Sequence, residues 1–219
     1  MTIIALAVAA LLHIHLLAIA ATARLFGIYV RSIRIGVGPR LLRIGRVEWR
    51  LLPLAGSVQL KDARDEVHHL EDPEAAPGKS LDAQPLWIRV AVSLSGCVAL
   101  VLLAILAHPG SALQSIVNGP AQLFQGAMDY HLGMGLIERV AALPQLGLVA
   151  AVGILAARMA ALNLLPAPPF NGGQAIIEVV FRGRPLPEWF DKVQRACLVL
   201  LLLWWIGWSV SIFNWVVRQ

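Results

Sequence analysis

Four stretches of the 219-residue chain are long, apolar and nearly free of charged residues, and they constrain the fold more than any other feature. A helix needs about 20 apolar residues to cross the roughly 30 Å hydrocarbon core of a bilayer. The composition agrees with membrane insertion, because 58% of the residues are hydrophobic and only 14% are charged. We therefore expect an all-α polytopic membrane protein with four transmembrane helices. The expected spans are residues 1–23, 88–107, 140–166 and 195–217.

The first apolar run has a second interpretation as a cleaved signal peptide, because Ala21-Thr22-Ala23 resembles a small-residue cleavage site. However, no Lys or Arg precedes the run, and its length is sufficient to span a membrane. We therefore expect it to be retained as a transmembrane helix.

The distribution of Lys and Arg predicts the orientation of the spans. Most basic residues lie between the first and second runs or between the third and fourth, whereas residues 108–138 contain none. The positive-inside rule places the basic connections in the cytoplasm, so both termini are expected to be extracytoplasmic. This topology also accounts for the net charge of +5, which therefore does not indicate a nucleic-acid partner.

The connection after the first span has two parts of different composition. Residues 28–60 alternate apolar and polar side chains between Gly and Pro breaks, which predicts a small β region at the cytoplasmic membrane boundary. Residues 61–86 are rich in polar residues and are expected to form a linker. The interval 108–139 is expected to be an extracytoplasmic loop.

The two cysteines, Cys97 and Cys197, both fall within expected spans, where a thiol usually serves as a small packing group. We expect no disulfide between them.

The most informative segment is NLLPAPPFNGG, residues 163–173, at the end of the third run. Three prolines and two glycines cannot continue a regular helix, and lipid does not tolerate exposed irregular backbone. The segment is therefore expected to be buried in protein or to line a polar cavity.

This segment resembles the signature of the site-2 protease family of intramembrane zinc metalloproteases. In that family, Asn, Pro, Pro and Asp-Gly-Gly recur at the same spacing, and Asn171 stands where the family has its metal-binding Asp. The matching positions are Asn163, Pro166, Pro168, Gly172 and Gly173.

Further stretches extend the resemblance along most of the chain. ARLFGIYVRSIRIGVGPRLL, residues 23–42, resembles the segment after the family's zinc helix, and LLPLAGSVQL, which contains Gly56, resembles its membrane-associated β region. SGCVALVLLA resembles the Gly-Pro-x-Ala-Asn motif of the second helix, with Cys97 and Leu100 in place of Pro and Asn. VNGPAQLFQGAMD resembles the short segment that precedes the third helix.

The resemblance implies a location in the bacterial inner (cytoplasmic) membrane. Many bacterial members carry a PDZ domain between their second and third spans, and a domain of that kind needs about ninety residues. The interval between those spans in this chain is too short for it. We expect one site-2-protease-like membrane domain over residues 1–219.

The resemblance also aligns the family's HExxH zinc motif with His15-Leu16-Leu17-Ala18-Ile19. In HExxH, two histidines one helical turn apart bind zinc, and the glutamate acts as a base toward the metal-bound water. Leu16 cannot accept a proton, Ile19 cannot bind zinc, and Asn171 offers only a neutral amide oxygen. A positioned base alone contributes about 10²- to 10⁴-fold to a rate. We therefore expect no catalytic residue and no metal cofactor; His15 and Asn171 are all that remains of a metal site.

These losses predict a catalytically degenerate homologue that acts as a membrane-embedded scaffold for a transmembrane protein or a subunit of a membrane complex. An open strand edge in the β region would bind such a partner through main-chain hydrogen bonds. Arg158 has two interpretations: an ionisable residue within a span is a functional candidate, and it can also reach toward the cytoplasmic interface. The residues expected to contact the partner are Gly56, Arg158, Asn163, Pro166, Pro168, Asn171, Gly172 and Gly173.

Two alternatives remain open. The first is an active intramembrane zinc metalloprotease with an atypical metal site that uses His15. His13 does not readily complete such a site, because two residues correspond to about 200° around a helix. The second is a small transporter or channel subunit, which the scarcity of polar residues in the spans disfavours.

Overall fold

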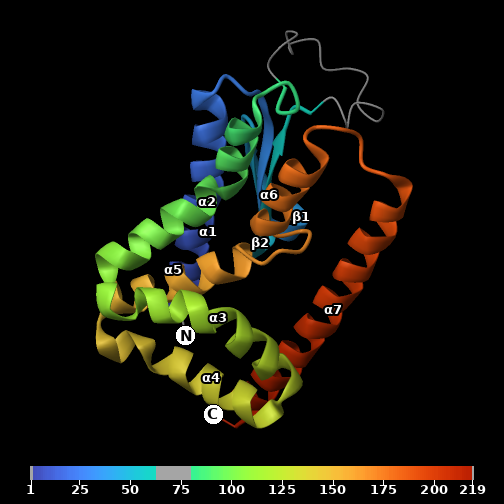
Figure 1. Ribbon diagram of the computed structural model, residues 1–219. Helices are drawn as coiled ribbons and strands as arrows, with labels where there is room; N and C mark the ends of the chain where they lie inside the picture. The colour runs from blue at the N-terminus through green and yellow to red at the C-terminus, as the bar shows by residue number, and fades with distance from the viewer. Residues whose placement is uncertain (1, 63–79, 219) are drawn as a thin grey trace.

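The computed structural model describes residues 2–62 and 80–218, and it is mostly helical (Figure 1). A two-stranded sheet follows the first helix, and every later described element is a helix. The expected polar linker lies mostly outside the described residues. The elements are α1 (Thr2–Leu25), β1 (Val30–Ile44), β2 (Val47–Leu60), α2 (Leu86–Ala107), α3 (Pro109–Met128), α4 (Tyr130–Ala142), the 3₁₀ turn η2 (Leu143–Leu146), α5 (Leu148–Asn163), α6 (Asn171–Phe181) and α7 (Glu188–Val217).

Three helices of the described chain, α1, α2 and α7, are long and apolar enough to cross a membrane. They correspond to three of the four expected spans. The remaining expected span, residues 140–166, is interrupted: Pro144 lies in η2, and Gly147 has a φ of 92° that ends this turn before α5 begins. The resulting α5 is a shorter apolar helix of 16 residues, which corresponds to about 24 Å.

The interval 108–139, expected to be a loop, consists largely of α3 and α4. Pro109 occupies the first turn of α3, where its missing N–H costs nothing. Asp129 separates the two helices, and its side chain accepts hydrogen bonds from the backbone N–H groups of His131 and Leu132 at 2.9 and 3.1 Å. This N-cap is a local signal for a helix start that our loop assignment did not use.

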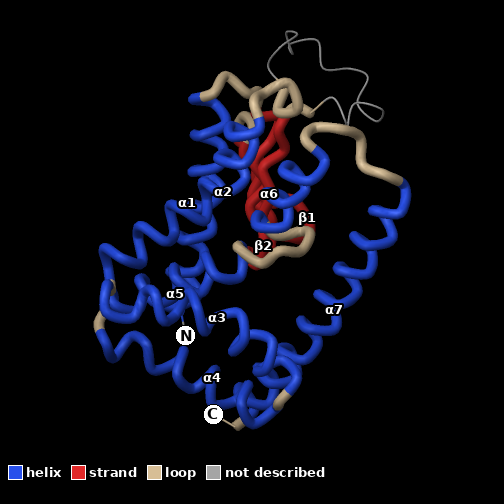
Figure 2. Tube along the Cα trace, viewed as in Figure 1, coloured by secondary structure: helices blue, strands red, loops and turns tan. Residues whose placement is uncertain are grey.

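The expected β region forms as two long, bent strands that pair with each other. Residues 33–35, in the first half of β1, lie between the two ends of β2; Ile33, for example, is paired both with Val58 and with Val47. Gly36 permits the bend: its φ is 97°, and a Cβ there would lie 2.8 Å from the carbonyl oxygen of Leu52. Figure 2 shows the strands running beside α1 and α2 and behind α6.

The buried apolar residues form two clusters along α1. One cluster joins the N-terminal half of α1 to α2 and α5, and the other joins its C-terminal half to β1 and the start of α2. In contrast, α7 packs mainly against α3 and α4, and most of its N-terminal half is exposed. The first turn of α7 also contacts the end of α6, where the ring centroids of Phe190 and Phe181 lie 5.8 Å apart. Figure 1 shows α7 running along the side of the molecule, apart from the sheet.

Candidate functional site

The aligned histidine of α1 lies against the first residue of α6. His15 is only 3% exposed, and its Nε2 lies 3.1 Å from Oδ1 of Asn171. These residues are 156 positions apart in the chain, and the fold brings together the two positions at which the family resemblance implied a metal ligand. Here their polar atoms are hydrogen bonded to each other.

The hydrogen bonds of Asn171 determine which atom of each side chain donates. Its Nδ2 lies 2.7 Å from the backbone carbonyl oxygen of Ser93 on α2. Since a carbonyl oxygen can only accept, this atom must be the amide nitrogen, and the amide oxygen must face the imidazole. It follows that His15 carries its proton on Nε2 and donates it to Asn171. The lone pair at this nitrogen is therefore not available to a metal in this arrangement.

Gly96 of α2 permits the close approach of α1 to α2 beside the imidazole. A Cβ at this position would lie 2.5 Å from Nδ1 of His15 and 2.8 Å from its backbone oxygen. Cys97 and Leu100, which replace residues of the family's second-helix motif, are fully buried. The side chains of Cys97 and Leu100 therefore act as packing groups in α2.

The other aligned HExxH positions are part of the apolar core. Leu16 is 2% exposed and Ile19 is 8% exposed, and both belong to the cluster that packs α1 against the sheet. The side chain of Leu16 occupies the space next to Gly56, where a Cβ would collide with it. The positions aligned with the family's base and second histidine are thus filled by hydrocarbon.

The neighbouring histidine of α1 has a different role. Nδ1 of His13 donates to the carbonyl oxygen of Ala9 at 2.7 Å, and its Nε2 accepts a hydrogen bond from Nε1 of Trp49 at 3.0 Å. Both ring nitrogens are therefore satisfied, and the side chain connects α1 to β2. This geometry agrees with the expectation that His13 and His15 point to different sides of the helix.

The segment 163–173 brings α5 and α6 together through close backbone packing. Nδ2 of Asn163, the last residue of α5, donates to the carbonyl oxygen of Met159 at 2.9 Å. Gly172 and Gly173 are buried, and a Cβ at either one would collide with the backbone of the segment itself. The two glycines are therefore required for the turn, whatever else the segment binds.

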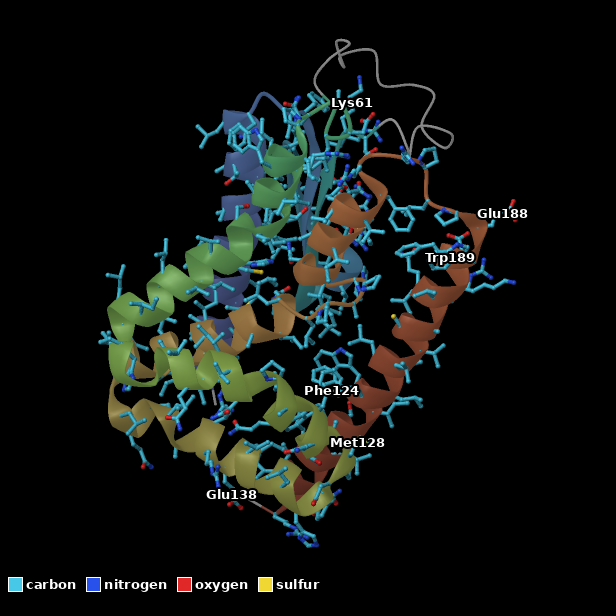
Figure 3. All side chains as sticks on the ribbon, viewed as in Figure 1. Lys61, Phe124, Met128, Glu138, Glu188 and Trp189 are labelled. Atoms are coloured by element: carbon cyan, nitrogen blue, oxygen red, sulfur yellow. The ribbon has the colours of Figure 1, made fainter. Side chains whose placement is uncertain are left out.

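A cleft of about 1770 Å³ opens between α7 and the rest of the molecule. It reaches His15 and Asn171 at one side and the tryptophans of α7 at the other. Figure 3 shows Phe124 of α3 on the side facing α7, where its ring centroid lies 6.3 Å from that of Trp204. The predicted contact residues that line the cleft are Gly56, Arg158, Asn163 and Asn171, whereas Pro166, Pro168, Gly172 and Gly173 do not line it.

A buried ion pair connects α2 to α6 and was not anticipated from the sequence. Nη1 of Arg89 lies 3.1 Å from Oε2 of Glu178, and their side chains are 5% and 6% exposed. The sequence offered only a weak signal, because Arg89 stands at the border of an apolar run. Glu178 also lines the cleft.

The sequence profile described as "Peptidase family M50" matches residues 3–205. This chain belongs to peptidase family M50, the site-2 protease family. A family M50 chain with three membrane-span candidates is an integral membrane protein. It is also 31% identical over 131 residues to a protein of Clostridium perfringens (strain 13 / Type A) named "putative zinc metalloprotease". That match covers 53% of this chain and 37% of the relative's length.

The side chains at this M50 site do not fit a zinc ion. A catalytic zinc site normally has three protein ligands drawn from His, Cys, Asp and Glu. Within residues 2–62 and 80–218, no three such side chains are grouped closely enough to hold a metal. At the aligned positions, Nε2 of His15 donates its proton to Asn171, and the remaining lone pair of the imidazole lies on Nδ1, next to Gly96. Asn171 supplies only a neutral amide.

Proposed function

We propose that this chain is a catalytically inactive member of family M50 that binds a transmembrane partner in its cleft without cleaving it. The observation that carries this proposal is the hydrogen bond between His15 and Asn171. The fold juxtaposes the aligned positions, yet the side chains there interact with each other rather than supplying the ligands of a zinc ion.

The chemistry that an M50 protease requires has no counterpart at these positions. A base must accept a proton from the attacking water, and Leu16 has no atom that can do so. The Leu16 side chain packs in an apolar cluster and against Gly56 of β2, and it offers no polar atom to hold a water molecule. We therefore assign this part of the fold to structure rather than to hydrolysis.

The edge of β2 supports the binding role. Residues 56–60 pair with β1 on one side, and all five line the cleft. An extended polypeptide placed along the opposite side of this edge would gain main-chain hydrogen bonds. We propose that a partner segment enters between this edge and α7 and pairs with β2 as an added strand.

The proposed topology has four membrane crossings. Three are α1, α2 and α7. The fourth, expected at residues 140–166, is α5 extended by α6, and the segment 163–173 that joins these two helices has irregular backbone packed in protein. Both termini lie at the end of the molecule away from the start of α2 (Figure 1). With the basic connections in the cytoplasm, both termini are extracytoplasmic in a bacterial cytoplasmic membrane.

A photo-crosslinking amino acid at Ser57 tests this proposal in native membranes. Ser57 lies on the β2 edge and lines the cleft, and a matched probe at Val199 lies on an exposed part of α7 outside the cleft lining. We expect Ser57 to yield one discrete, full-length membrane protein that Val199 does not. A crosslinked partner cut within its membrane segment, or no partner specific to Ser57, would contradict the scaffold function.

A further inference from the structure

Arg158 presents a charge to the cleft without a carboxylate partner. Its Nη2 donates to Oε1 of Gln122 on α3 at 3.3 Å, and its Nε is buried without a hydrogen bond. No carboxylate lies within ion-pair distance of it among the described residues. Arg139 of α4, a charge of the same sign, lies close enough to repel it electrostatically.

The carboxylates that line the cleft are engaged elsewhere. Glu48 lies 3.7 to 3.9 Å from three arginines of the sheet, and Glu178 pairs with Arg89. Asp62, which follows β2, also has its own interaction. None of the three is available to neutralise Arg158.

A cation in this setting requires a counter-ion. The cleft is lined mainly by apolar and aromatic side chains, and ionisable residues within membrane-spanning segments characteristically pair with an opposite charge. A neutral amide such as that of Gln122 satisfies one N–H of the guanidinium but does not compensate its charge. The missing anion is therefore expected to come from whatever occupies the cleft.

We propose that Arg158 selects a partner whose membrane segment carries an aspartate or glutamate, which forms an ion pair with the guanidinium inside the cleft. This inference rests on the proposed scaffold function and specifies the chemistry of its partner. The carboxylate belongs to a polypeptide rather than to a lipid, because the same cleft also exposes the β2 edge at residues 56–60. A lipid tail has no main-chain groups to pair with a strand edge, whereas one polypeptide can engage both features.

Binding of synthetic transmembrane peptides to the full chain tests this selection. The protein is reconstituted in phosphatidylcholine vesicles with a dansyl-labelled peptide of about 20 apolar residues that carries one central Glu, Gln or Lys. Binding is followed by energy transfer from the tryptophans of the protein, three of which line the cleft. We expect the Glu peptide to bind at least about tenfold more tightly than the Gln peptide.

Variants of the cleft arginine separate charge pairing from general structure. Arg158→Gln is expected to remove the preference for Glu, and Arg158→Glu is expected to reverse it in favour of the Lys peptide. A gain of Lys binding cannot result from misfolding. Arg184→Gln, at an exposed position outside the cleft lining, serves as the matched control and keeps the preference for Glu.

Three results would overturn the proposal. The first is a Glu peptide that binds no more tightly than the Gln peptide, and the second is a preference that persists in Arg158→Gln. The third is a loss of the preference when phosphatidylglycerol is added, because the anion would then be a lipid headgroup. Equal binding of all peptides would leave the scaffold function in place, since that function is judged separately by crosslinking at Ser57.

Discussion

Replacing Glu178 by Gln is expected to lower the free energy of unfolding by about 3–5 kcal/mol, the cost of breaking a buried ion pair from one side. The substitution keeps the shape of the side chain and removes its charge, so the guanidinium of Arg89 remains buried without compensation. The pair joins α2 to α6 at 3.1 Å, and its loss therefore weakens the attachment of the helix that carries Asn171. Chemical unfolding in detergent micelles, followed by circular dichroism, measures the change.

Two further variants determine whether charge is the cause. Glu188→Gln removes a carboxylate from the exposed first turn of α7 and is expected to change stability by less than about 0.5 kcal/mol. The double variant Arg89→Met with Glu178→Met removes both charges and is expected to recover most of the loss. If Glu178→Gln were as mild as Glu188→Gln, the ion pair would have no structural importance.

Replacing Gly207 by Ala is expected to destabilise the protein by about 1–3 kcal/mol, the usual cost of overpacking. A Cβ at this position of α7 would collide with the backbone of Ala127 on α3, which cannot move as a flexible side chain can. Because α7 packs mainly against α3 and α4 in the described chain, this crossing holds the far wall of the cleft. The midpoint of unfolding in detergent measures the effect.

Gly135→Ala is the matched control for this substitution. Gly135 also lies within a helix, but a Cβ there meets nothing within 4 Å. Alanine is favoured over glycine in helices by about 1 kcal/mol, so this variant is expected to be neutral or more stable. Equal loss of stability in both variants would show that the contact of Gly207 with Ala127 does not hold α7.

The membrane-spanning character of the chain was predictable because it depends on composition over one local stretch. An apolar run of sufficient length identifies α1, α2 and α7 without knowledge of any tertiary contact. The interrupted third run was not predicted correctly in detail, because an apolar composition does not show where Pro144 and Gly147 end a helix. The helices α3 and α4 were also missed, although Asp129 provides a local capping signal.

The site was predictable only in part, because its interactions join distant segments. Resemblance to the family paired His15 with Asn171 as related positions, but the hydrogen bond between them depends on the carbonyl of Ser93 and on the close approach at Gly96. The ion pair of Arg89 with Glu178 had no counterpart in the sequence analysis, since neither residue indicates its partner. The contact between Arg158 and Gln122 likewise requires the packing of α3 against α5.

The zinc content of the purified chain tests the central claim most directly. Elemental analysis would compare the native protein with the triple variant Leu16→Glu, Ile19→His and Asn171→Asp, which restores the aligned ligands and base on adjacent turns of α1 and at the start of α6. We expect no zinc in the native protein and about one ion per chain in the variant. A native protein that holds one zinc per chain, lost on His15→Ala, would contradict the account and identify an active metal site.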